Sequence, residues 1–155
     1  MAAKLVNESK SEEIHNLFLK DRADTDEIFY RSKETFGYFK KNYVIFRELM
    51  FSQNLVVIKD GDNQLLVENM SKINPANTVL IVRHAVGSIS FIKEALGILS
   101  KLFKGRHVSK AKILCFANEI TKDVDNLTAA GFEKEIEYAI GENDRVCYSF
   151  KFKYD

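Results

Sequence analysis

Three patterns of apolar and polar positions follow one another along the first part of this chain. Helical spacing predicts an amphipathic helix from about residue 9 to 22 and a second from about 26 to 43. Two β-rich runs around the turn sequence DGDN predict a hairpin over residues 54–69. The run VIFRELMFS, residues 44–52, fits a helix and a strand equally well, and both assignments stay open.

The middle of the chain reads as strand, helix, strand. TVLIVRHAV begins with a continuous apolar run, typical of a strand covered on both faces, and predicts a strand over residues 78–84. Apolar residues at helical spacing predict a helix over 88–103, and AKILCFAN predicts a second buried strand over 111–117. We expect these elements to form a right-handed parallel crossover.

A long hairpin closes the chain. A short helix over residues 121–130 is expected to end at Gly131, because glycine adopts the left-handed conformation common at helix C-termini. Residues 132–138 and 146–152 then alternate apolar and polar side chains, which predicts two antiparallel strands joined by a turn built on Gly141, Asn143 and Asp144.

This order of elements predicts one domain over residues 1–155. The fold class is α/β (α+β), with a mixed, mostly antiparallel central sheet flanked by helices. Pro75 is the only proline, and no linker or repeat interrupts the chain.

Charge and composition limit the classes of partner that this chain is expected to bind. Lys and Arg total 23 against 22 Asp and Glu, so no basic excess favours nucleic acid, and we expect no nucleic-acid partner. No apolar stretch approaches the roughly 18 residues of a membrane span, and the N-terminus has no apolar signal core, so we expect no membrane partner and a cytoplasmic location. The three histidines show no metal-ligand spacing, and Cys115 and Cys147 are expected to be buried free thiols.

Two charged groups have alternative interpretations. Basic residues around position 105 form a solvated helix end, a contact for the nucleotide end of a cofactor, or a contact for an acidic partner; they are Lys101, Lys104, Arg106, His107, Lys110 and Lys112. Alternation places Glu133, Glu135 and Glu137 on one face of the closing hairpin. That face is either solvated, which protects a sheet edge, or it attracts a cationic acceptor.

Three stretches, together with the element order, resemble the GCN5-related N-acetyltransferase (GNAT) superfamily. TVLIVRHAVGSISFIKEALGILSKLF resembles its acyl-coenzyme A segment, KAKILCFAN the following strand, and LTAAGFEKE the helix that ends in Gly-Phe before the last two strands. The resemblance implies a GNAT-like acyl-CoA N-acyltransferase fold, acetyl-CoA (coenzyme A) as cofactor, and acetyl transfer to a small-molecule or peptide amine acceptor. A non-catalytic or degenerate GNAT-fold binding or assembly module is the alternative, and a homodimer is possible.

The same resemblance assigns cofactor-binding residues to the strand-to-helix junction. They are Ile81, Val82, Arg83, His84, Ala85, Val86, Gly87, Ser88 and Asn118. Residues 85–88 would form a small-residue turn whose backbone N–H groups, with the helix dipole, favour a pyrophosphate, and Arg83 would be the nearby cation. Asn118 would lie beside the acyl-pantetheine arm or, like Thr121, cap a helix.

The loop departs from the family pattern of Arg or Gln, two residues, Gly, one residue, and Gly or Ala. In a register that starts at Arg83, the first glycine position falls on Val86. In a register that ends at Gly87, Ala85 takes that position and Val82 replaces the Arg or Gln.

The catalytic groups depart as well. The family's frequent tyrosine acid stands four residues before Gly-Phe, and Leu127, which cannot donate a proton, occupies that position. Glu68 and Tyr138 are the weak candidates for catalytic residues. Amine attack on a thioester can also proceed through positioning, with water carrying the proton.

Overall fold

The structure is a computed structural model that describes residues 3–22, 26–70, 79–106, 108–116, 124–138 and 145–153. Its elements in chain order are β1 (Lys4–Val6), the 3-10 helix η1 (Glu8–Lys10), α1 (Ser11–Leu19), β2 (Ile28–Arg31), α2 (Lys33–Lys41), α3 (Tyr43–Phe51), β3 (Leu55–Asp60), β4 (Asn63–Asn69), β5 (Val79–Gly87), α4 (Ile89–Leu102), β6 (Lys110–Phe116), α5 (Val124–Ala129), β7 (Glu133–Tyr138) and β8 (Arg145–Lys151).

The strands form one mixed, mostly antiparallel sheet. Seven follow the order β1-β3-β4-β5-β6-β8-β7, and β2 pairs with β5 off this path. Only β5 and β6 are parallel among the described pairs, and α4 connects them, so the predicted parallel strand-helix-strand unit is confirmed. The predicted fold class is confirmed with it.

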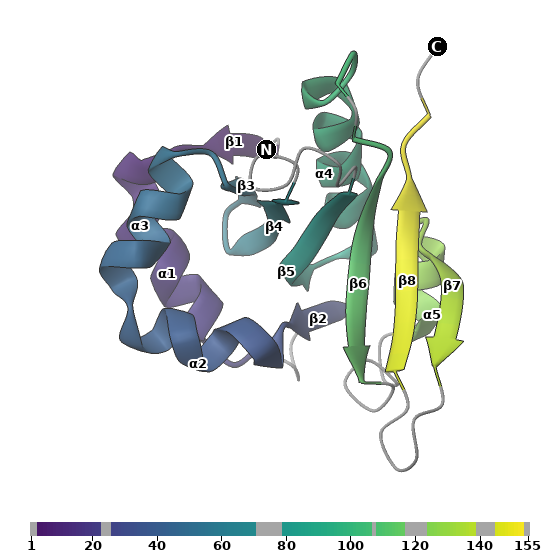
Figure 1. Cartoon of the computed structure of the whole chain (residues 1–155), viewed down its shortest axis with the longest axis horizontal. Coiled ribbons are helices and arrows are strands. Elements are labelled where there is room, and N and C mark those ends of the chain that lie inside the picture. Colours follow the sequence, from purple (N-terminus) through teal and green to yellow (C-terminus); the bar gives the residue numbers. More distant parts are fainter. Residues whose placement is uncertain are drawn as a thin grey trace.

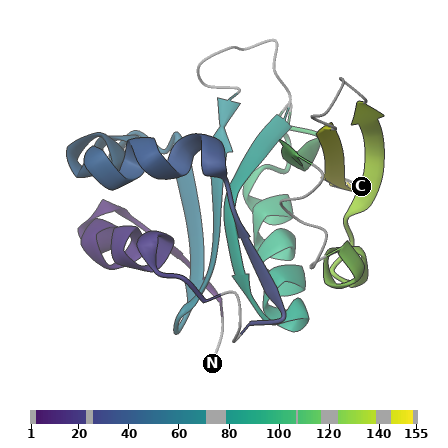
Figure 2. The ribbon, with the colours of Figure 1, turned by 90° about the horizontal axis from the view of Figure 1, so that it is seen from below.

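Helices cover the two faces of the sheet differently. α1, α2 and α3 lie against one face, whereas α4 lies against the other (Figures 1 and 2). The α1–α3 face has its own apolar cluster, which includes Phe18, Phe39, Phe46 and Leu66. A larger cluster forms between the sheet and α4, because α4 turns Phe91, Ile92, Ala95, Leu96 and Leu99 inward.

The expected helix over residues 26–43 is wrong in its first part. Residues 28–31 form the strand β2, and α2 begins only at Lys33. In β2 the side chains of Ile28 and Tyr30 are buried in the larger cluster, while Phe29 and Arg31 face the other side. This alternation has the period of a strand, and pairing with β5 decides the conformation. The open run 44–52 is helical, in α3.

β5 continues beyond the predicted strand end. It runs to Gly87, and Ser88 alone separates it from α4, so the expected small-residue turn over 85–88 is not present. Ala85 and Val86 are fully buried strand residues. The pairing of β4 with β5 shifts by one residue at Arg83, which forms a β-bulge and divides β5 into two parts.

The closing hairpin forms as predicted, but a β-bulge between Lys134 and Ile136 of β7 interrupts the alternation that would place Glu133, Glu135 and Glu137 on one face. Gly131 has φ +112°, and the N–H of Phe132 donates to the carbonyl of Leu127, which ends α5 with a left-handed glycine. β7 and β8 are antiparallel. The predicted turn residues Gly141, Asn143 and Asp144 lie outside the described residues.

Three further observations concern location and chemistry. None of the helices in the described ranges has the length and apolar character needed to cross a membrane. Within the same ranges, no group of three His, Cys, Asp or Glu residues is placed to hold a metal ion. Cys147 is a buried free thiol, as predicted, whereas the side chain of Cys115 lies outside the described set.

Candidate functional site

The candidate site lies where β5 meets α4 and parts from β6. The parallel ladder between β5 and β6 covers three pairs, from Val79–Lys110 to Ile81–Lys112. Beyond them β2 takes the place of β6 beside β5, paired with residues 84–87 (Figure 1). The edge of β5 that precedes α4 is therefore already paired within the chain.

The start of α4 holds a carboxylate from a distant part of the chain. The N–H of Ile89, the first residue of the helix, donates to Glu27 Oε2 over 2.7 Å. The N–H of Phe91 donates to the hydroxyl of Ser88 over 3.1 Å, which makes Ser88 the N-cap. Because the first turn of a helix exposes N–H groups and carries the positive end of the dipole, this position favours an anion.

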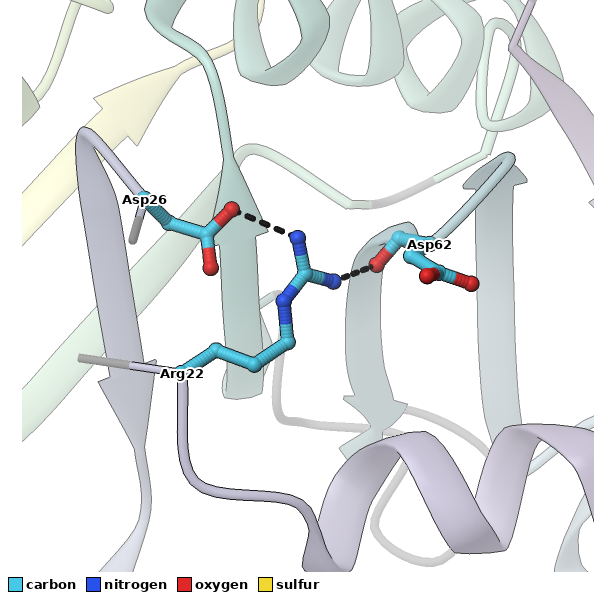
Figure 3. A network of polar contacts seen from close by, with 3 residues as sticks. All are labelled: Arg22, Asp26 and Asp62. Atoms are coloured by element: carbon cyan, nitrogen blue, oxygen red, sulfur yellow. Dashed lines mark hydrogen bonds and ion pairs between the residues drawn. The ribbon is translucent and has the colours of Figure 1, made fainter. Parts of the chain in front are cut away.

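Glu27 is held from both sides. Asn126 Nδ2 of α5 donates to the backbone carbonyl of Glu27 over 2.5 Å. On the other side, Arg22 binds the carboxylate of Asp26 over 2.6 Å and donates to the backbone carbonyl of Asp62 in the β3–β4 turn (Figure 3). These contacts fix the chain just before β2 to two neighbouring parts of the fold.

Gly87 is needed here for its backbone and for the space around it. It has φ +139°, which side chains rarely allow, and a Cβ at this position would lie 2.8 Å from the side chain of Asn63. The glycine therefore has a structural reason that does not involve a ligand.

His84 is fully buried on the α1–α3 face. Its ring packs edge-on against Phe18 and Phe29, at 5.3 and 6.0 Å between centroids, and its Nδ1 lies 3.0 Å from Gln64 Nε2. Burial, with the charges of Arg31 and Arg22, lowers the pKa of His84 to about 3. Among the described residues, His84 Nε2 and Gln64 Oε1 have no hydrogen-bond partner. The imidazole is thus neutral, and it does not lie at the α4 start.

The predicted cation and the predicted base bind each other. Arg83 Nε donates to Glu68 Oε1 over 2.9 Å, and both side chains are less than 15% exposed. Glu34 of α2 lies 3.8 Å from the same guanidinium. Each charge in this pair is compensated by the other, so neither Arg83 nor Glu68 presents an uncompensated charge to a ligand.

The other predicted positions are core residues or fall outside the description. Val82 and Leu127 are fully buried, and Ile81 is half-buried. Leu127, in the place of the family's acid, packs in the larger cluster. Asn118 and the side chain of Tyr138 lie outside the described residues.

Glu27 and Asn126 meet at the start of α4, and sequence reasoning missed both. The alternation of IFYR, directly after two carboxylates, was the available signal for a strand in this place. The partner across the sheet could not be predicted from it.

The described basic residues around position 105 lie at and after the C-terminal end of α4, and one of them binds a glutamate of β7. Lys110 forms an ion pair with Glu135, and Lys110 lowers the pKa of that carboxyl. A helix of 14 residues is about 20 Å long, so the basic residues that follow α4 lie about that far from its start. This placement favours a helix-end role for them, and Glu135 already has a cationic partner.

Solved structures share this arrangement over nearly the whole chain. A probable acetyltransferase from Staphylococcus epidermidis is 12% identical, with a TM-score of 0.65 over 97% of this chain and 98% of that one. A chimera of the spermidine N-acetyltransferase SpeG from Vibrio cholerae and hSSAT is 14% identical, with a TM-score of 0.61 over 97% and 96%. RimL, a ribosomal-protein α-N-acetyltransferase in complex with coenzyme A, is 13% identical, with a TM-score of 0.61 over 98% and 95%.

The fold is that of the GNAT acetyltransferases. The sequence matches no known family profile and no curated protein. The likeness is therefore one of structure, and it leaves the substrate of this GNAT-fold chain open.

Coenzyme A fits this site only in part. The start of α4 suits a phosphate group, because it binds the Glu27 carboxylate through the same N–H that a phosphate would use. The edge of β5 does not suit a ligand while β2 is paired with residues 84–87. A phosphate can bind the Ile89 N–H only where Glu27 releases it.

Proposed function

We propose that this protein is an acetyl-CoA-dependent N-acetyltransferase that acts on an amine, in the cytoplasm. One observation carries the proposal: in a chain with the GNAT fold over nearly its full length, the helix that follows the parting strands begins with an anion-binding N–H group. The Ile89 N–H and the Ser88 hydroxyl are the groups that would hold the pyrophosphate. The cofactor would supply the acetyl thioester.

This chain would contribute mainly positioning. Glu68 is paired with Arg83, and Leu127 has no proton to donate, so neither is an acid or base available to the reaction. Positioning an amine beside a thioester can by itself lower the barrier substantially. The acceptor is an amine of a small molecule or a peptide.

A second candidate is a non-catalytic GNAT-fold binding or assembly module, including a homodimer. The single residue between β5 and α4 favours it, because it replaces the loop that the family pattern requires. The paired edge of β5 favours it as well.

Ligand binding and turnover separate the two candidates. We expect saturating acetyl-CoA, at about 100 times its Kd, to raise the thermal midpoint by about 5 to 10 °C, whereas AMP does not. Release of free thiol with a panel of polyamines and peptide N-termini then measures transfer. Binding without release across the panel would support the module, and an unchanged midpoint with no heat of binding would contradict the proposed function.

A further inference from the structure

Residues 26–32, called segment 26–32 below, lie against residues 83–89, which include most of the residues assigned to the cofactor. Glu27 binds the first N–H of α4, and β2 pairs with residues 84–87 of β5. The N–H of Ser32 donates to the carbonyl of Arg83 over 2.9 Å, so the bulge is covered too. The segment runs along β5 to the start of α4 (Figure 2).

We infer that Glu27 is an internal competitor for the anionic group of the cofactor at the start of α4, held in place by segment 26–32. This inference rests on the proposed function, because it concerns the same site. It assigns a regulatory role to a carboxylate that binds neither the acetyl group nor the amine.

Competition follows from the geometry of the helix start. The N–H groups of Ile89 and Phe91 are both engaged, by Glu27 and by Ser88. A phosphate cannot take the Ile89 N–H while Glu27 holds it, and two anions at one helix end repel each other. Removing Glu27 therefore frees a donor and removes a negative charge in one step.

The two parts of segment 26–32 differ in how easily they can leave. Glu27 is an exposed residue, so its carboxylate can turn into solvent. Ile28 and Tyr30 are 0% and 3% exposed and belong to the larger apolar cluster, so β2 is fixed. The carboxylate of Glu27, not its backbone, is thus the part that moves, and the start of α4 can open while β5 stays covered.

Two substitutions and a matched control test this inference. Glu27→Gln removes the charge and keeps an acceptor oxygen, whereas Glu27→Ala removes both. Glu48→Gln makes the same change of charge on α3, at a side chain that is 60% exposed. Acetyl-CoA and inorganic pyrophosphate are the probes, measured by titration calorimetry on the full chain.

We expect Glu27→Ala to bind both probes about tenfold more tightly than wild type, which corresponds to about 1.4 kcal/mol. Glu27→Gln should gain about threefold, and Glu48→Gln should match wild type. Without ligand, amide hydrogen exchange at Ile89 should be faster in Glu27→Ala and unchanged in Glu48→Gln. Should Glu27→Ala fail to fold, Glu27→Gln carries the same comparison.

The outcomes distinguish this inference from the proposed function. Equal affinities of wild type and both Glu27 variants for the two probes overturn the inference and leave acetyl-CoA binding in place. If neither wild type nor any of the variants binds acetyl-CoA, the proposed function is overturned. Tighter pyrophosphate binding by Glu27→Ala would in that case still support Glu27 as the competing anion. Failure of both probes with every protein overturns both.

Discussion

The two parts of β5 do different work, although one strand contains both. Before the bulge at Arg83, β5 lies between β4 and β6 and belongs to the parallel crossover. After the bulge it lies between β4 and β2, and it leads directly into α4. The first part joins β4 to β6 in the sheet. The second part is covered by β2, so its edge at the candidate site is already paired.

The comparison shows how a site can be covered while the fold is kept. Side chains of both parts, such as Val82 and Ala85, lie in the same apolar cluster under α4. The two parts differ in the strand paired to the edge of β5 that faces away from β4. That strand is β6 in the first part and β2, which lies between α1 and α2 in the sequence, in the second.

The largest effect is expected at Gly87, in the second part. Gly87→Val should destabilise the protein by about 4 kcal/mol, because φ +139° is strained for a β-branched residue and its Cβ would lie 2.8 Å from Asn63. Urea unfolding measures the change. Gly97→Ala in α4 is the control, since nothing lies within 4 Å of its Cβ, and it should stabilise the protein by about 0.5 to 1 kcal/mol. If Gly87→Val lowers the free energy of unfolding by less than 1 kcal/mol, the positive φ and the close approach of Asn63 at this position are wrong.

The first part of β5 was predictable from the sequence, and the second, beyond His84, was not. A continuous apolar run such as VLIV specifies a buried strand by itself, and the spacing of α4 specifies the helix. The residues AVGS suit a turn equally well, because their strand conformation depends on pairing with β2, which lies more than 50 residues earlier in the sequence. Local patterns contain no information on such a partner. For the same reason Glu27 escaped prediction, while Gly131, whose role is local, did not.

The anchoring of β2 gives the next effect. Ile28→Ala should cost about 3 kcal/mol of stability, because the side chain is fully buried beside Gly87. Leu5→Ala in β1 is a suitable control: Leu5 is 47% exposed, and its loss should cost less than 1 kcal/mol. Equal unfolding midpoints in urea for the two variants would show that β2 is not part of the core.

His84 makes the second part sensitive to pH. Its pKa is about 3 in the folded chain and about 6.5 when unfolded, so the unfolded chain takes up a proton first as the pH falls below 6.5. The stability that the neutral His84 imidazole contributes is fully present above pH 6.5, and it is lost progressively as the pH falls toward 3. Between pH 7.5 and 5.0 we expect a loss of about 2 kcal/mol from His84. His84→Gln should lose correspondingly less over the same interval, and parallel pH profiles of the two proteins would argue against a neutral buried imidazole.

The smallest effect concerns the boundary between the parts, where Arg83 binds Glu68. Glu68→Gln should lower stability by about 1 kcal/mol, since glutamine keeps an acceptor oxygen for Arg83 Nε and, among the described contacts, Arg83 also keeps the longer one to Glu34. Glu34→Gln, at a side chain 74% exposed and 3.8 Å from the same guanidinium, should cost a few tenths of a kcal/mol at most. If the protein transfers acetyl groups, kcat should stay within about twofold in both variants, because a carboxylate engaged by Arg83 does not serve as the base. A fall of a hundredfold or more in Glu68→Gln alone would instead be the size expected for loss of a general base, and would return Glu68 to that role.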